Sequence, residues 1–412
     1  MDWIEQREDR KTTFWDSPQE QYDENVEITL LSLRAYAQGK KLAVTYSGGK
    51  DSSATLSLII WAIESGQLQV DDLIILYADT GLELPPLAVT AEATLSELDA
   101  RGYKTKIVKA PVESRLYVKM LGFGYPYPTN RRRWCTRLLK QEPMSKAISE
   151  LDGEWTLITG VRLNESDQRD AVITASCSTG DGECGQGWYQ QNKNALAPIV
   201  HWRACHVFRW IFNDERNSLP VLKGIEPVYK LDEFVDNGIR TGCIKCQVVH
   251  KDRSFNALVK HSPEWQWLAP LHELDVLHKW LAQPAQRLQK ATLTLKADGT
   301  YRNRITNPIG PVHIEARQKG LEWIMKIQDE TNKGAPDGLS ISLVSLEEEM
   351  MIRDMWANNI YPSDWTGDEP HGDEIVDVPI VINGIHVATQ KTLPNIGTVT
   401  IDIFEAQHES AD

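Results

Sequence analysis

The stretch Lys41-Leu-Ala-Val-Thr-Tyr-Ser-Gly-Gly-Lys-Asp-Ser-Ser53 decides the fold of this chain. Its first six residues are mainly apolar or β-branched and predict a short buried strand. Two glycines then form a turn, and the pattern from Ser52 to Ile63 predicts a helix. A strand that passes through a glycine turn into a helix aims backbone N–H groups and the positive helix end at an anion. The stretch therefore predicts an α/β fold with an anion-binding loop.

Strands and helices alternate after this loop. Apolar and β-branched runs predict three further strands, at 73–78, around 105–108 and at 155–159. A helical pattern at about 87–100 lies between the first two of these strands. This alternation predicts a doubly wound parallel sheet covered on both faces. Ligands bind such sheets beyond the carboxyl ends of the strands. The loops that begin at Ser47, Asp79 and Gly160 all follow strand ends and predict one site.

The whole chain divides into four predicted regions. Helical patterns at 315–328 and 347–356 are the clearest in the second half. Near the end, an Asn383-Gly384 turn between two β-like runs predicts a small hairpin. The regions are a helical lead-in (1–40), an α/β domain with a cysteine cluster (41–260), a helical C-terminal domain (261–370) and a β-hairpin tail (371–412).

Composition restricts the class of protein. The 412 residues are 41% hydrophobic and 25% charged, as in ordinary globular proteins. The N-terminal residues are charged and do not form a secretory signal, and the longest apolar stretch, 54–63, is too short to span a bilayer. We therefore expect a cytoplasmic protein with no membrane partner.

The net charge of −14 disfavours a broad nucleic-acid-coating face. A polyanion would have to bind a local basic run, and the best candidate is Arg131-Arg132-Arg133 with Arg137 and Lys140. The alternative is that this run is only a solvated charged surface.

The residues of the glycine loop suit a nucleotide. Gly48 and Gly49 let the backbone approach phosphate, Lys50 adds a positive charge, and the neighbouring serines add hydroxyl donors. Asp51 is a candidate ligand for Mg²⁺, which prefers carboxylate and phosphate oxygens. The spacing GxxxxGK[ST] is absent, so the usual loop for β,γ-phosphate cleavage is excluded.

Two other strand ends carry polar residues. Asp79 or Thr80 can hydrogen-bond a ribose or an adenine edge. Arg162 and Arg169 carry guanidinium groups, which suit bidentate phosphate contacts. The alternative is that both arginines form ion pairs at the protein surface.

The sequence SGGKDS resembles the PP-loop of ATP pyrophosphatases, which cleave ATP between the α and β phosphates. Residues 77–83, 159–169 and 134–143 extend the resemblance to the phosphoadenosine-phosphosulfate (PAPS) reductase branch. The resemblance implies that Lys50, Asp51 and Arg162 are catalytic and that ATP contacts Ser47, Gly48, Gly49, Lys50, Asp51, Ser52, Ser53, Asp79, Thr80, Gly160, Arg162 and Arg169.

Six cysteines are present, and two of them, Cys243 and Cys246, have a spacing that fits zinc or an iron–sulfur cluster. Similarity to the iron–sulfur reductases adds Cys135, and Cys205 completes the preferred ligand set for a [4Fe–4S] cluster. Cys184 is held in reserve. Zinc in the same ligands and the absence of any metal stay open.

Cys246 is the last cysteine, whereas a PAPS or adenylyl-sulfate reductase carries a nucleophilic cysteine in a C-terminal tail. Residues 240–254 instead resemble the DndC and SspD proteins of DNA phosphorothioation. Asp236 stands where DndC-type proteins carry a further cysteine, which favours the shorter SspD-like type.

This resemblance implies that ATP adenylates a DNA backbone phosphate and that sulfur from a cysteine desulfurase then displaces AMP. The expected partners are DNA, the desulfurase and other subunits of a phosphorothioation complex. A PAPS-type oxidoreductase, a tRNA thiolation enzyme and a non-catalytic nucleotide-binding scaffold are the alternatives.

Overall fold

The computed structural model describes residues 18–129, 132–163, 195–229, 243–246, 252–289, 310–369, 371–372, 376–382, 385–392 and 399–401. The chain packs as two compact units. The first contains residues 1–110, 136–246 and 251–266, and the second contains 111–135, 247–250 and 267–412. The predicted lead-in (1–40) therefore belongs to the first unit, and residues 111–135 of the predicted α/β domain belong to the second. The predicted domain boundaries stay a prediction.

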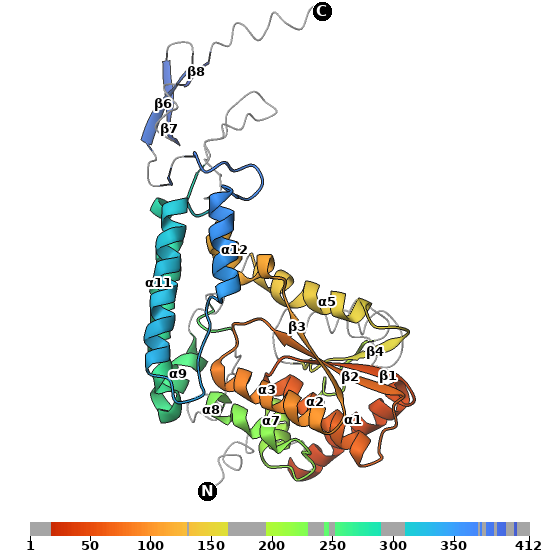
Figure 1. The fold of residues 1–412 in the computed structure, drawn as a ribbon. Coiled ribbons are helices and arrows are strands. Elements are labelled where there is room, and N and C mark those ends of the chain that lie inside the picture. The colour runs from red at the N-terminus through yellow and green to blue at the C-terminus, as the bar shows by residue number, and fades with distance from the viewer. Residues whose placement is uncertain are drawn as a thin grey trace, which may run out of the picture. The chain divides into compact units, whose positions relative to one another are not determined.

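A five-stranded parallel sheet forms the centre of the first unit, as predicted (Figure 1). Its strand order is β3-β2-β1-β4-β5. The strands are β1 (Lys41–Tyr46), β2 (Asp72–Asp79), β3 (Lys104–Lys109), β4 (Trp155–Ile158) and β5 (Ala195–Leu196). The order reverses between β1 and β4, because β2 and β3 extend the sheet on one side and β4 and β5 on the other. Such a reversal is the usual ligand position in open α/β sheets.

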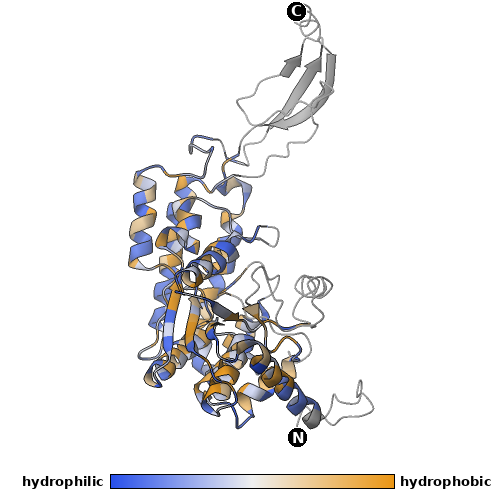
Figure 2. Ribbon diagram, turned by 90° about the vertical axis from the view of Figure 1, so that its right-hand side faces the viewer, coloured by the Kyte–Doolittle hydropathy of each residue, from blue (hydrophilic) through white to orange (hydrophobic). Residues whose placement is uncertain are grey.

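Helices cover both faces of this sheet (Figure 1). Ala43, Leu76 and Val108 pack against α5 on one face. Leu42 and Val44 alternate with Ala43 and are fully buried on the opposite face. Figure 2 shows hydrophobic residues gathered on the sheet and on the helices that pack against it. Among the described residues of this unit, the main α-helices are α1 (Pro18–Ala37), α2 (Lys50–Glu64), α3 (Pro85–Ala100), α5 (Glu142–Ser149), α7 (Ala204–Phe212), α8 (Glu226–Tyr229) and α9 (Arg253–His261).

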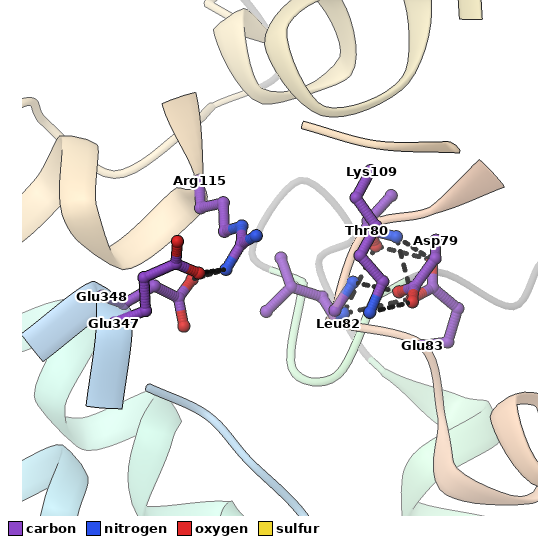
Figure 3. A network of polar contacts seen from close by, with 9 residues as sticks. Asp79, Thr80, Leu82, Glu83, Lys109, Arg115, Glu347 and Glu348 are labelled. Carbon is purple, nitrogen blue, oxygen red and sulfur yellow. Dashed lines mark hydrogen bonds and ion pairs between the residues drawn. The ribbon is translucent and has the colours of Figure 1, made fainter. Parts of the chain in front are cut away.

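The second unit is mainly helical and contains α10 (Glu273–Leu281), α11 (Ile314–Lys333) and α12 (Leu346–Ala357). The predicted helices at 315–328 and 347–356 are therefore confirmed. Trp356 Nε1 donates a hydrogen bond of 2.7 Å to the carbonyl of Leu121, and Arg317 Nη1 donates one of 2.5 Å to that of Gly122. Arg115 pairs with Glu347 at 3.5 Å at the start of α12 (Figure 3). These contacts fix α11 and α12 to the segment 115–122.

A small sheet ends the described chain. β6 (Val376–Ile382) and β7 (Ile385–Thr392) pair antiparallel, which confirms the predicted hairpin. The turn at 383–384 lies outside the described residues. The sequence interpretation did not include the third strand, β8 (Val399–Ile401), which pairs parallel with β6. None of the helices that the structure describes combines the length and the apolar composition of a membrane span.

Candidate nucleotide site

The glycine loop connects β1 to α2 at the strand-order reversal. Gly48 has a φ of +72°, in the left-handed region that favours glycine, and a Cβ there would lie 3.4 Å from the carbonyl oxygen of Leu87. Gly49 is the N-cap of α2 in an extended conformation, and its position carries no side-chain cap. The hydroxyl of Ser52 accepts the Ser47 N–H at 3.2 Å and donates to the Gly49 carbonyl at 2.9 Å. The loop is therefore braced by its own serine, and the positive end of α2 faces the loop.

Three charged side chains meet at this helix end. Lys50 Nζ lies 2.9 Å from Asp51 Oδ2, and Arg162 Nε lies 2.5 Å from Asp51 Oδ1. Lys50 is 6% exposed and Arg162 is 4% exposed. Two buried cations against one carboxylate leave a positive charge without a counter-charge in this trio. Because buried charge is costly unless it is paired, the trio at a helix N-terminus favours an anionic ligand.

Gly160 allows the loop after β4 to approach the glycine loop. A Cβ at this residue would lie 2.8 Å from the backbone nitrogen of Ser52 and 2.9 Å from the carbonyl oxygen of Asp51. Both are backbone atoms, so no side-chain rotation can relieve the clash. The absence of a side chain at Gly160 therefore lets Arg162, two residues later, reach Asp51. Arg162 is held from its other side, since its Nη1 donates to the Trp202 carbonyl at 3.2 Å.

Hydrogen bonds within residues 79–83 hold the loop after β2 (Figure 3). Thr80 Oγ1 donates to Glu83 at 2.6 Å, and the N–H groups of Thr80 and Leu82 donate to the same carboxylate. Asp79 accepts the Gly81 N–H at 2.8 Å and pairs with Lys109 at 2.7 Å. These contacts hold the loop in one shape and engage both candidate side chains, so their predicted contact with adenosine stays a prediction.

Sequence reasoning missed Tyr229, at the end of α8. Its hydroxyl accepts the backbone N–H of Lys50 at 3.2 Å, and Lys50 Nζ lies 5.7 Å from the centre of its ring. Tyr229 is 6% exposed. The contact spans 179 residues of chain and belongs to no local motif. No signal in the sequence could have placed Tyr229 beside the glycine loop.

The Cys243–Cys246 turn lies at the same edge of the sheet. The Ile244 N–H donates to the Leu82 carbonyl at 2.7 Å, and the Cys246 N–H donates to the Cys243 carbonyl at 3.2 Å. Lys245 has a φ of +52° and is 2% exposed, with its ammonium 4.8 Å from the Phe255 ring centre. The turn is thus docked on the loop after β2. Both cysteines are half-buried on it, which fits two of the four ligands of an iron–sulfur cluster.

The other two proposed ligands come from different places. Cys205 is the second residue of α7 and is exposed, although nearby groups partly desolvate its thiol and raise its pKa. Cys135 belongs to the second unit. The four-cysteine ligand set therefore stays a prediction. Cys184, Arg169 and Arg131 lie outside the described residues.

The rest of the basic run is divided. Arg132 and Arg133 are exposed in the second unit, whereas Arg137 belongs to the first and pairs with Glu142 at 2.6 Å. Aromatic rings lie on both sides of Arg132 and Arg133 in the sequence: Tyr125 precedes them and Trp134 follows them. The two rings meet edge to face with centroids 5.6 Å apart. We call Tyr125, Arg132, Arg133 and Trp134 the basic-aromatic segment.

The strand order, the glycine loop and the buried charged trio define a doubly wound α/β domain with an anion-binding loop at its strand-order reversal. Residues 41–224 match the family model of the phosphoadenosine phosphosulfate reductase domain.

Two uncharacterized proteins of Methanocaldococcus jannaschii are similar in sequence. One is 29% identical over 244 residues, which are 58% of this chain and 43% of that protein. The other is 26% identical over 203 residues, which are 49% of this chain and 40% of that protein. The matched stretches cover less than half the length of these curated relatives.

Two solved structures are also similar. The phosphoadenylyl-sulfate (PAPS) reductase from Candida auris has 15% identity and a TM-score of 0.30, over 48% of this chain and 88% of that chain. The U34-tRNA thiolase NcsA from Methanococcus maripaludis, with its [4Fe-4S] cluster, has 14% identity and a TM-score of 0.31, over 63% and 80%.

Proposed function

We propose that this protein is an ATP pyrophosphatase that adenylates its substrate in preparation for sulfur transfer. The observation that carries the proposal is the buried trio of Lys50, Asp51 and Arg162 at the N-terminus of α2. The family match of residues 41–224 supports chemistry on an adenine nucleotide.

The trio and the loop suit the cleavage of ATP between its α and β phosphates. An acceptor oxygen attacks the α-phosphorus, the bond from that phosphorus to the bridging oxygen breaks, and pyrophosphate leaves with the bond electrons. Lys50, Arg162 and the loop amides offset the charge that grows on the leaving group. Asp51 is the residue that would hold Mg²⁺, which supplies further charge neutralisation. Tyr229 orients the backbone of Lys50.

We propose a DNA backbone phosphate as the acceptor. Adenylation of a non-bridging oxygen makes AMP the leaving group, and the outer sulfur of a persulfide then forms the phosphorus–sulfur bond as AMP departs. A thiol reductant cleaves the remaining sulfur–sulfur bond, which leaves the phosphorothioate and a disulfide. The sulfur would come from a cysteine desulfurase, within a complex with other phosphorothioation subunits. The net charge of −14 predicts weak binding of DNA by the isolated chain, with contact through a local cationic surface.

The basic-aromatic segment is our proposed contact for single-stranded DNA, because aromatic faces stack bases while arginines bind phosphates. We expect Arg132→Ala with Arg133→Ala to weaken binding of a single-stranded oligonucleotide. The slope of log K against log salt should fall by about 1.4, since each lost phosphate contact removes about 0.7. Lys319→Ala with Lys326→Ala, two exposed lysines of α11, is the matched control. Equal losses in both double variants would mean that only net charge matters.

A further prediction is that the protein binds a [4Fe–4S] cluster. Protein purified without oxygen should be brown and contain about four irons per chain. Cys243→Ser and Cys246→Ser should each bleach it, because a cubane needs all its thiolates. Cys177→Ser is the control and should leave the colour unchanged, because Cys177 is outside the predicted ligand set. A colourless protein with about one zinc ion per chain would instead assign a structural zinc site.

Product analysis tests the acceptor. The protein is incubated with a desulfurase, cysteine, ATP and DNA, and the digested DNA is searched by mass spectrometry for phosphorothioate dinucleotides. Sulfur found in tRNA bases instead would identify a tRNA thiolation enzyme, and sulfite formed from PAPS would identify a PAPS-type oxidoreductase. Either result would contradict the assignment of DNA as the acceptor. ATP binding without any turnover would identify a scaffold subunit.

A further inference from the structure

Three potential metal ligands meet in the second unit, outside the nucleotide site. His313 is the N-cap of α11, Glu315 lies in the first turn of that helix, and His371 comes from a segment more than fifty residues later. One ligand atom from each side chain lies within 4.8 Å of the other two. Over the described ranges, this is the one group of three or more His, Cys, Asp or Glu side chains with that spacing.

The backbone around these ligands is held in place by other contacts. The Gly372 N–H donates to the carbonyls of Pro284 and Arg287, at 3.1 and 2.8 Å, and Leu288 forms an antiparallel bridge with His371. The His313 N–H donates to the Gln286 carbonyl at 3.2 Å. The segment 284–288 therefore anchors both histidines, and their approach does not depend on the three side chains alone.

The side chains form a compact arrangement that opens toward solvent. The two imidazole rings stack with centroids 4.1 Å apart and planes 8° apart. Because the nitrogen lone pairs lie in the ring planes, one ring must turn out of this stack before both histidines can bind a single ion. Glu315 Oε2 lies 2.8 Å from His313 Nδ1. His313 is 8% exposed, whereas the Glu315 side chain is 73% exposed. His313 is thus shielded, His371 is half-buried and the Glu315 carboxylate is accessible.

We propose that His313, Glu315 and His371 bind a divalent zinc ion. Two imidazole nitrogens and one carboxylate oxygen are a ligand set that zinc accepts, with a fourth position left for water. An ion there would join the N-terminus of α11 to the segment that precedes β6. Binding to the folded state alone would also raise the melting temperature.

The alternative is a purely structural contact, because His313 Nδ1 also accepts the Ala316 N–H at 3.3 Å as a helix cap. His313 variants would disturb that cap, so the test uses the other two ligands. Glu315→Gln changes an exposed side chain and preserves its volume. The matched control is Glu322→Gln, which removes an exposed carboxylate about two turns further along α11.

The full chain is stripped with a chelator and titrated with Zn²⁺ and, separately, with Co²⁺. We expect the unchanged protein and Glu322→Gln to bind one more ion than His371→Asn, and Glu315→Gln to bind that ion at least about tenfold more weakly. The Co²⁺ bound there should show visible ligand-field bands without the near-ultraviolet charge-transfer band of thiolate ligands, which separates it from the cysteines.

Equal ion counts in the unchanged protein and His371→Asn, together with equal affinity in Glu315→Gln, would overturn the proposal and leave a capped helix with two stacked histidines. The readout is independent of ATP turnover. Failure of the proposed function would therefore leave this result unchanged.

Discussion

Lys50→Ala should lower the rate of pyrophosphate release from ATP by roughly 10²–10³-fold, the usual effect of removing one preorganised group that stabilises transition-state charge. Lys50 is buried at the N-terminus of α2 and contacts Asp51 at 2.9 Å. Without it, Arg162 is the remaining cation of the trio and is balanced by Asp51, so the site loses its excess positive charge. The measurement is steady-state release of pyrophosphate under saturating ATP and Mg²⁺.

The control for this variant is Lys40→Ala. Lys40 is exposed and immediately precedes β1, so its loss changes the net charge equally without reaching the site. Circular dichroism should show that both variants keep the fold. If Lys50→Ala released pyrophosphate at the rate of the control, the glycine loop would not be the site of cleavage.

Gly160→Ala should impair turnover almost as strongly, although it removes no functional group. The added Cβ would lie 2.8 Å from the Ser52 nitrogen and 2.9 Å from the Asp51 carbonyl oxygen, so the two loops must separate. Overpacking of this kind costs about 1–3 kcal/mol of stability. A displacement of about 1 Å at a reacting centre costs about 10²-fold in rate, and Arg162 would be displaced from Asp51. Pyrophosphate release and thermal unfolding are measured on the same samples.

Gly334→Ala is the matched control for this substitution. Gly334 is the C-cap of α11 with a φ of −94°, and its added Cβ would lie 3.4 Å from the Trp267 Cβ, an ordinary contact. It should keep full activity. An active Gly160→Ala enzyme would show that close approach of the loop after β4 is not needed for catalysis.

The fold was predictable because its signals are local. The run from Lys41 to Tyr46, the two glycines and the apolar helix that follows are adjacent in sequence, and they specify strand, turn and helix in order. The strand-order reversal then places Gly160 and Arg162 beside Asp51, as the common position of parallel strand ends implies.

The parts that were missed depend on contacts between distant residues. Tyr229 meets Lys50 across 179 residues, and nothing around Tyr229 marks it as a site residue. His371 lies beside His313 and Glu315 because the segment 371–372 is bonded to the segment 284–288, which is distant in sequence. The docking of the Cys243–Cys246 turn on Leu82 is equally non-local. Periodicity and spacing describe neighbours along the chain and do not report such contacts.

The most direct test of the central claim is the product pattern from ATP labelled at its α-phosphate. The protein is incubated with labelled ATP, Mg²⁺ and single-stranded DNA, and the products are separated by chromatography beside the Lys50→Ala variant. Cleavage at the site of Lys50, Asp51 and Arg162 predicts labelled AMP, or label transiently attached to the acceptor, with an equal amount of unlabelled pyrophosphate. Labelled ADP with inorganic phosphate, formed equally by the variant, would contradict it.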